Sequence, residues 1–321
     1  MNSPTAGTPG ADAASTPVAA AANRLTRNAL LTLVRREFWE HRVLWMAPLV
    51  VAGLLLACSL GARVDFDLNV DRAQWLDPQR RGTLFALAQW GLAAPHFLVM
   101  AMVLSFYLLD CLYAERKDRS ILFWKSLPVS DGATVASKLL VALGVVPLGV
   151  FALACLTNLL FTGIWNLRAS IGQSGALVLW DTLTWLKVEA AMLLALIVSI
   201  LWYAPVAAYL LLVSAWARRN AILWGSLPPV VAPIVERIAF GTHYIGGLIS
   251  YRINGIWRAL PNALEHSFSQ AGHGRPMSAG ALLEGLNVPA AFANIDLWLG
   301  LIAAGGFAFA AARIRRYRDD S

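Results

Sequence analysis

The stretch LWMAPLVVAGLLLACSLG, residues 44–61, contains no charged side chain. Its length is close to the ~20 apolar residues that an α-helix needs to cross the hydrocarbon layer of a bilayer. Five more apolar runs follow along the chain, at about 84–110, 139–163, 188–216, 221–240 and 295–312. The sequence therefore predicts an all-α membrane protein with six transmembrane helices.

The composition indicates that most of the chain lies out of water. Hydrophobic residues make up 58% of it and charged residues only 14%, with a mean hydropathy of +0.59. Soluble domains carry about a quarter charged residues. The net charge of +7 comes from basic residues that flank the apolar runs, as in membrane proteins. Because no basic run is interleaved with stacking aromatic residues, we expect the lipid bilayer as a partner and no nucleic acid.

Two segments precede the first apolar run. Residues 1–24 are rich in Ala, Pro, Thr, Ser and Gly, which is typical of a disordered tail. Residues 25–43, LTRNALLTLVRREFWEHRV, form a basic amphipathic pattern, which predicts a helix lying along the cytoplasmic membrane surface. The residues expected at that surface are Arg35, Arg36, Phe38 and Trp39. The alternative is a helix that simply extends the first span into the cytoplasm.

The basic residues also predict the orientation. Sixteen of the 26 Lys and Arg residues fall before the first span, between spans two and three, between spans four and five, or after the last span. Since basic residues concentrate in cytoplasmic loops, both termini are expected in the cytoplasm. The six-helix domain would cover residues 44–316, with a cytoplasmic loop at 113–138 and an extracellular segment at 241–294. That extracellular segment has the composition for helices that enter the membrane without crossing it.

Catalytic motifs are missing from the sequence. No Gly-Lys dipeptide occurs, so the chain has no P-loop, and neither a Gly-x-Ser-x-Gly nor a His-Glu-x-x-His motif is present. Glu37, Glu40 and His41 are close in sequence, and we interpret them as surface charge rather than as a metal site. We therefore expect no catalytic residue, no bound cofactor and no metal in this chain.

Charged residues near the outer ends of the apolar runs bear on transport. They are Lys187, Glu189, Glu236, Arg237 and Asp296. A proton-driven carrier requires a carboxylate near the bilayer centre, and none of these acidic residues is placed there by the sequence. The pattern argues against a secondary transporter.

The loop after the second span is the most informative part of the sequence. It reads YAERKDRSILFWKSLPVS over residues 113–130, charged in its first half and apolar in its second. Apolar side chains in a cytoplasmic loop need a surface that covers them. Ser130 is suited to cap the following helix, and Asp131 complements the dipole at its start. These features predict a short amphipathic helix on the cytoplasmic face that is rigidly joined to a span, as a lever pushed by a soluble partner would require. The alternative is a surface helix packed on the bilayer.

This loop resembles the second-loop signature of ABC-2-type transporter permeases, the membrane subunits of bacterial ABC transporters, and the LVRREFWEHR lead-in is similar too. The resemblance implies a type V exporter fold in the inner membrane, with an interfacial N-terminal helix and short extracellular helices before the last span. It also implies two permease chains, identical or different, and a separate ATPase subunit that binds ATP. The residues that would contact the ATPase are Glu115, Arg116, Ile121, Leu122, Phe123, Trp124 and Leu127.

Two other classes of function remain open on the sequence. One is a membrane scaffold or sensor that transports nothing. The other is an intramembrane enzyme acting on lipid or peptide, for which Glu189, Glu236 and Asp296 are the polar residues to test. The substrate of a transporter cannot be read from the sequence.

Overall fold

The computed structural model describes residues 32–61, 78–118, 130–171, 182–252 and 292–317, and the regular structure in these ranges is helical. The helices are α2 (Val43–Gly61), α4 (Pro78–Lys117), α6 (Asp131–Leu140), the π-helical turn η1 (Val141–Val145), α7 (Val146–Ser170), α8 (Thr182–Trp216), α9 (Ala221–Phe240) and α13 (Ile295–Tyr317). Residues 32–40 and 244–252 are helical as well. The prediction of an all-α fold is confirmed for this part of the chain.

Within the described residues, six helical segments are long and apolar enough to cross a membrane. They are Val43–Gly61, Phe85–Lys117, Asp131–Arg168, Thr182–Trp216, Ala221–Phe240 and Ile295–Tyr317. Each overlaps one of the six apolar runs in the sequence, so the prediction that these six runs form membrane-length helices is confirmed. The third segment combines α6, η1 and α7 in one continuous rod, which joins the residues that follow 119–129 directly to a helix of membrane-spanning length.

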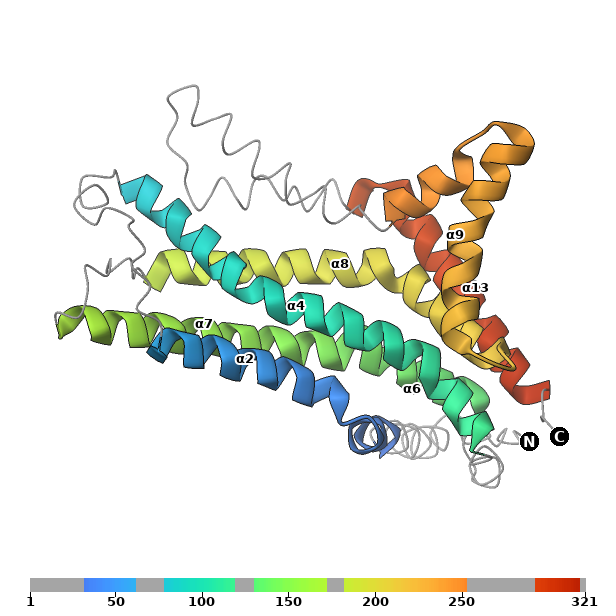
Figure 1. Cartoon of the computed structure of the whole chain (residues 1–321), viewed down its shortest axis with the longest axis horizontal. Coiled ribbons are helices and arrows are strands. Elements are labelled where there is room, and N and C mark those ends of the chain that lie inside the picture. The colour runs from blue at the N-terminus through green and yellow to red at the C-terminus, as the bar shows by residue number, and fades with distance from the viewer. Residues whose placement is uncertain (1–31, 62–77, 119–129, 172–181, 253–291, 318–321) are drawn as a thin grey trace, which may run out of the picture.

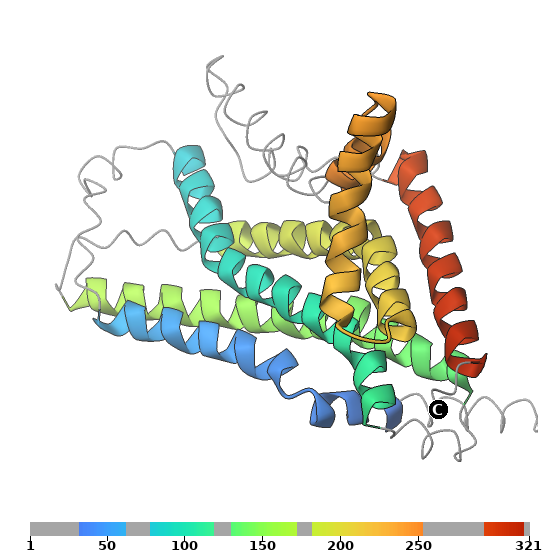
Figure 2. The ribbon, with the colours of Figure 1, turned by 45° about the vertical axis from the view of Figure 1, so that its right-hand side comes forward.

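The helices form two groups that meet at one end of the molecule. Helices α2, α4, α7 and α8 lie side by side, whereas α9 and α13 run steeply across the end of this group (Figures 1 and 2). Helix α13 packs mainly along α8, whose ribbon bends along its course and contains Pro205. A proline inside a helix removes a hydrogen bond and commonly causes such a bend. The largest core cluster lies where the groups meet and includes Leu112, Val141 and Leu211.

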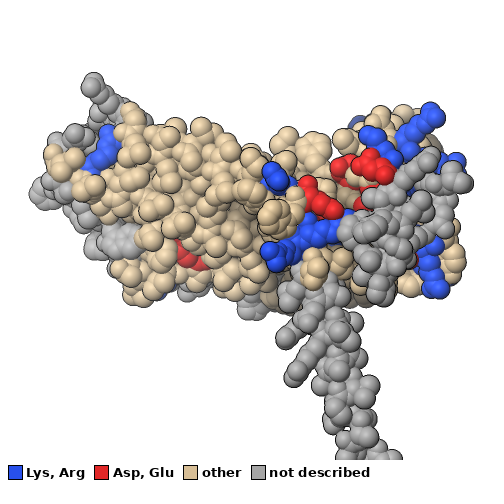
Figure 3. All heavy atoms as spheres, turned by 90° about the horizontal axis from the view of Figure 1, so that it is seen from below, with Lys and Arg blue, Asp and Glu red and all other residues tan. Residues whose placement is uncertain are grey.

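The outer surfaces of the helices are apolar. Ile238 on α9 is 81% exposed, and Ile302 and Phe309 on α13 are 72% and 69% exposed. Figure 3 shows a long stretch of surface with few charged side chains, and most of the charged side chains in this view lie toward the end where α6 and α13 lie. Soluble monomers rarely expose apolar surface on this scale, and lipid is the solvent that suits it. These are the features of a multi-pass membrane protein.

The N-terminal helical residues 32–40 are a separate element from α2. The helix ends before His41 and Arg42, and α2 begins at Val43. Figure 1 shows residues 32–40 nearly end-on, while α2 runs across the view. The alternative of a straight extension of the first span is therefore wrong for these residues. Their position at a membrane surface stays a prediction.

Two local features of the backbone affect the shape of the spans. Asn220 adopts φ 49° in the short turn between α8 and α9, a left-handed conformation that Asn tolerates better than most residues.

The π-helical turn η1 lies just before Pro147, whose missing N–H cannot bond to the carbonyl of Leu143. A wider turn at this point accommodates the proline without ending the rod.

Glu236, near the end of α9, caps the helix at 244–252. Its carboxylate accepts hydrogen bonds from the backbone N–H groups of Tyr244 at 2.6 Å and Ile245 at 2.7 Å, and from the hydroxyl of Thr242 at 2.9 Å. The first N–H groups of a helix have no partner within the helix, and a carboxylate also complements the dipole. This structural role accounts for a residue that the sequence had left as a candidate for catalysis.

We predict that Glu236→Ala loosens the helix at 244–252 and leaves the rest of the fold intact. The amide groups of Tyr244 and Ile245 lose their acceptor, so their hydrogen exchange should become faster in the variant. The exposed neighbour Arg237 provides the control, because Arg237→Gln leaves the cap in place. Unchanged exchange at Tyr244 and Ile245 in Glu236→Ala would contradict the role of the carboxylate.

Candidate functional site: a buried ion-pair network

Lys138 on α6 is completely buried between two carboxylates. Its Nζ lies 2.8 Å from Oε1 of Glu37, in the 32–40 helix, and 3.1 Å from Oε1 of Glu115, near the end of α4. The hydroxyl of Tyr107 on α4 donates to the other oxygen of Glu37 at 2.8 Å. One cation thus connects three helical elements in the interior of the protein.

Arg315 extends the network to the last helix. Its guanidinium binds Oε2 of Glu115, and its Nε lies 3.0 Å from Oδ1 of Asp131 at the start of α6. On the other side, Nη2 of Arg36 lies 3.5 Å from Glu115, and Nε of Arg36 lies 2.6 Å from Glu40. We call the connected set of Arg36, Glu37, Glu115, Asp131, Lys138 and Arg315 the ion-pair network.

Within the network, three carboxylates, those of Glu37, Glu115 and Asp131, face three cations, those of Lys138, Arg315 and Arg36. Arg36 also pairs with a fourth carboxylate, that of Glu40, which is 41% exposed to solvent. A buried charge is tolerated when it is paired and hydrogen-bonded, whereas an unpaired one is very costly. Such a network contributes more to fixing one arrangement of its helices than to net stability, since removing the charges from water offsets much of their attraction.

Residues of the ion-pair network lie on both sides of residues 119–129, the middle of the loop after the second span. Glu115 lies shortly before residues 119–129, and Asp131 and Lys138 follow directly after them. The same network reaches Glu37 in the first described helix and Arg315 in the last. The residues on either side of 119–129 are therefore held together and fastened to the first and the last described helices.

The first helical turn after the loop is built as the sequence predicts. Ser130 is the N-cap of α6, and its Oγ accepts a hydrogen bond from the N–H of Ala133 at 3.1 Å. Asp131 is the acidic residue of the first turn. The helix therefore starts at a fixed position, which sets where Lys138 points two turns later.

Glu115 and Arg116 both have internal partners. Glu115 is 5% exposed within the network, and Nη2 of Arg116 donates to the carbonyls of Ser214 and Ala217, each at 2.7 Å, at the end of α8. A contact of either residue with an ATPase stays a prediction. The other five residues expected at that contact, Ile121, Leu122, Phe123, Trp124 and Leu127, lie outside the described residues.

The residues expected at a membrane surface divide into two kinds. Arg36 belongs to the ion-pair network, and Phe38 is half-buried against the largest core cluster. Arg35 and Trp39 are exposed, with Trp39 at 67%. The amphipathic pattern at 25–43 therefore has a packed face, and that face rests on the protein.

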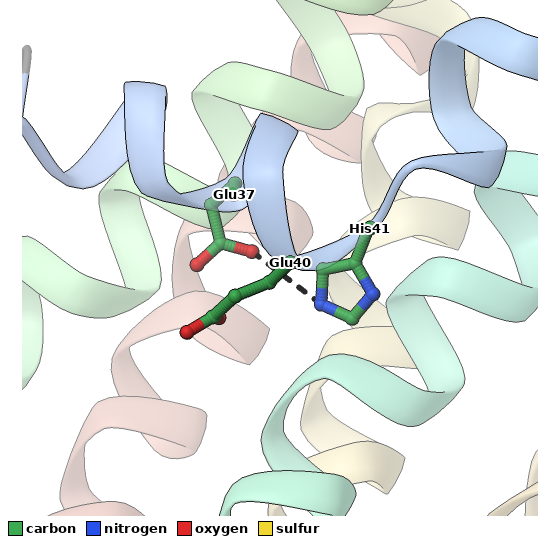
Figure 4. Close-up of side chains that lie close together, drawn as sticks. All are labelled: Glu37, Glu40 and His41. Atoms are coloured by element: carbon green, nitrogen blue, oxygen red, sulfur yellow. Dashed lines mark ion pairs between the residues drawn. The ribbon is translucent and has the colours of Figure 1, made fainter.

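Glu37, Glu40 and His41 converge, with one ligand atom of each within 4.8 Å of the others (Figure 4). The interpretation of Glu37 as surface charge is wrong, because its side chain is buried and bound by Lys138 and Tyr107. The carboxylate of Glu40 is held by Arg36. Burial lowers the pKa of His41 even though Glu37 opposes the shift. Both carboxylates already have cationic or hydrogen-bonding partners, so ion pairing explains the convergence of the three residues better than a metal site does.

Comparison of the chain with protein-family models, with curated proteins and with solved structures finds no match.

We predict that Lys138→Met destabilises the protein by about 3–5 kcal/mol, because it leaves the buried carboxylate of Glu37 without its cation. Thermal unfolding of the detergent-solubilised chain, followed by circular dichroism, measures the loss. The double variant Glu37→Gln with Lys138→Met removes the pair together and should be less destabilised than Lys138→Met alone. The exposed Lys187 gives the control, since Lys187→Met should change little. Equal melting of Lys138→Met and Lys187→Met would contradict the role of the network.

Proposed function

We propose that this chain is the membrane-spanning permease subunit of an ATP-driven transporter of the ABC-2 type in the bacterial inner membrane. A separate ATPase subunit binds and hydrolyses ATP, and a second permease chain completes the path for the substrate. Both termini lie in the cytoplasm, the 32–40 helix lies along the membrane surface, and export is the direction of transport. The fold in this proposal is that of a type V exporter.

The single observation that carries the proposal is that the residues on both sides of 119–129 are joined by ion pairs to each other and to the first and last described helices. Glu115 and Asp131, which flank this segment, share Arg315, and Glu115 also shares Lys138 with Glu37. A force applied to this loop by a soluble partner would pass into α4, into the α6–α7 rod and into α13 at once. Elements joined by buried charge pairs move together, because separating them leaves uncompensated charge in the interior.

The apolar composition of residues 121–127 supports a contact between this segment and a soluble partner protein. The stretch ILFWKSL at 121–127 is mostly apolar and lies between charged residues and the cap at Ser130. Aromatic and aliphatic side chains of this kind supply the central contacts of protein interfaces. The absence of a P-loop from the sequence supports ATP binding by the partner and not by this chain.

Copurification tests the proposal. The tagged full-length chain, expressed in its own host, should bring down a P-loop ATPase, whereas the purified chain alone should hydrolyse no ATP. Trp124→Asp and Leu127→Asp should each abolish recovery of the ATPase by placing a carboxylate in an apolar contact. Trp124→Phe keeps an apolar aromatic ring at the same position and should retain the partner.

Correct folding of the Asp variants is checked by their melting temperature, which should equal that of the unmodified chain. Full recovery of the ATPase with both Asp variants would overturn the assignment of the 119–129 loop as the contact. If no P-loop protein copurifies with the chain under any condition, the result would favour a membrane scaffold or sensor instead of a transporter subunit.

A further inference from the structure

The short turn between α8 and α9 presents basic and aromatic side chains at the ends of two membrane-length helices. Arg218 and Arg219 lie in the turn, and both are exposed. Trp216 is the last residue of α8 and Trp224 lies in the first turn of α9, and they are 46% and 39% exposed. Their rings form an edge-to-face pair with centroids 5.1 Å apart. We call residues 216–224 the α8–α9 surface.

The α8–α9 surface carries an excess of positive charge. Its sequence, WARRNAILW, contains two arginines and no acidic residue. The ion pairs within 4.0 Å among the described residues involve neither Arg218 nor Arg219. Because both arginines are exposed, their guanidinium groups can reach a negatively charged partner outside the chain.

The backbone at the end of α8 is held in place by α4. Nη2 of Arg116 donates to the carbonyls of Ser214 and Ala217, each at 2.7 Å. The hydroxyl oxygen of Ser214 accepts hydrogen bonds from the backbone N–H groups of Leu112 at 3.1 Å and Tyr113 at 3.0 Å. A ligand at the turn would therefore have to order side chains rather than the end of the helix, which lowers the entropic cost of binding.

The α8–α9 surface lies where the hydrocarbon layer should meet water. It joins the end of Thr182–Trp216 to the start of Ala221–Phe240, and both segments are long and apolar enough to cross a membrane. Ile222 and Leu223, beside the turn, are 55% and 51% exposed and suit contact with acyl chains. Tryptophan is enriched at this boundary because its ring is apolar and its N–H is polar. The arginines would then lie at the level of the lipid headgroups.

We propose that the α8–α9 surface binds the headgroup of an anionic phospholipid, with Arg218 and Arg219 contacting the phosphate and Trp216 and Trp224 lying at the boundary. Guanidinium groups match phosphate oxygens with pairs of N–H donors. A zwitterionic headgroup also carries a phosphate, but residues 216–224 offer no carboxylate to bind its positive group. The surface therefore favours a headgroup whose net charge is negative. This inference does not depend on an ATPase partner.

Native mass spectrometry of the purified full-length chain in detergent tests the proposal, with dioleoylphosphatidylglycerol as the anionic probe and dioleoylphosphatidylcholine as the zwitterionic one. We expect the anionic lipid to bind more tightly. Its dissociation constant should rise roughly tenfold or more in the double variant Arg218→Gln with Arg219→Gln, since each cation near an anionic headgroup adds attraction. The control Lys187→Gln with Arg237→Gln removes two exposed cations near the opposite ends of α8 and α9 and should bind as the unmodified chain does.

Equal binding of the two lipids by the unmodified chain would overturn the proposal, as would full affinity for phosphatidylglycerol in the double arginine variant. A double variant that keeps this affinity but no longer copurifies with a P-loop ATPase would assign the surface to a protein partner instead. Inorganic phosphate added at the same concentration as the lipid should not displace it. Displacement would mean that the ligand is a soluble anion, which also overturns the lipid site. Melting curves verify that each variant is folded before binding is measured.

Discussion

The amine of Lys138 between the carboxylates of Glu37 and Glu115 is the interaction on which the arrangement of the helices depends. The three residues come from the first described helix, from α6 and from α4, and Arg315 adds the last helix through Glu115. Apolar packing alone allows helices in a membrane to slide and rotate, because lipid solvates their surfaces as well as neighbouring helices do. Buried charges favour the arrangement in which each charge meets its partner.

Much of the fold follows from the sequence because the bilayer imposes a length. Each of the six span-forming helices overlaps an apolar run, and the cap at Ser130 follows from a residue type with a known local preference. The ion-pair network could not be predicted from the sequence in the same way. Glu37 lies in a basic segment next to Arg36 and looks like surface charge until the packing shows which side of the helix is covered. Lys138 and Arg315 are far apart in the chain, and nothing in their local sequence indicates that they share Glu115.

A second polar cluster, between α4, α7 and α8, could not be predicted for a related reason. Glu189 stood out as a charged residue in an apolar run, but its neighbours Asn158 and Gln89 are uncharged and lie on other helices. The Nδ2 of Asn158 lies 3.4 Å from both the backbone carbonyl of Gln89 and Oε1 of Glu189, and these contacts arise only from the packing of the three helices. Helix α4 carries residues of this cluster and of the ion-pair network, with Gln89 in its first half and Glu115 near its end. It is therefore the element through which a change at one end of the bundle would reach the other.

The π-helical turn at Val141–Val145 has a further consequence for how the third span is aligned. An α-helix advances by about 100° per residue, so one extra residue in a turn shifts the angular position of everything beyond it by about that amount. Lys138 lies before this turn, and Cys155 and Asn158, which are within hydrogen-bond distance of Glu189, lie after it. The turn thus sets the angle between the side of the rod that faces Glu115 and the side that faces Glu189. A chain shortened by one residue at this point could satisfy one of these contacts only by rotating away from the other.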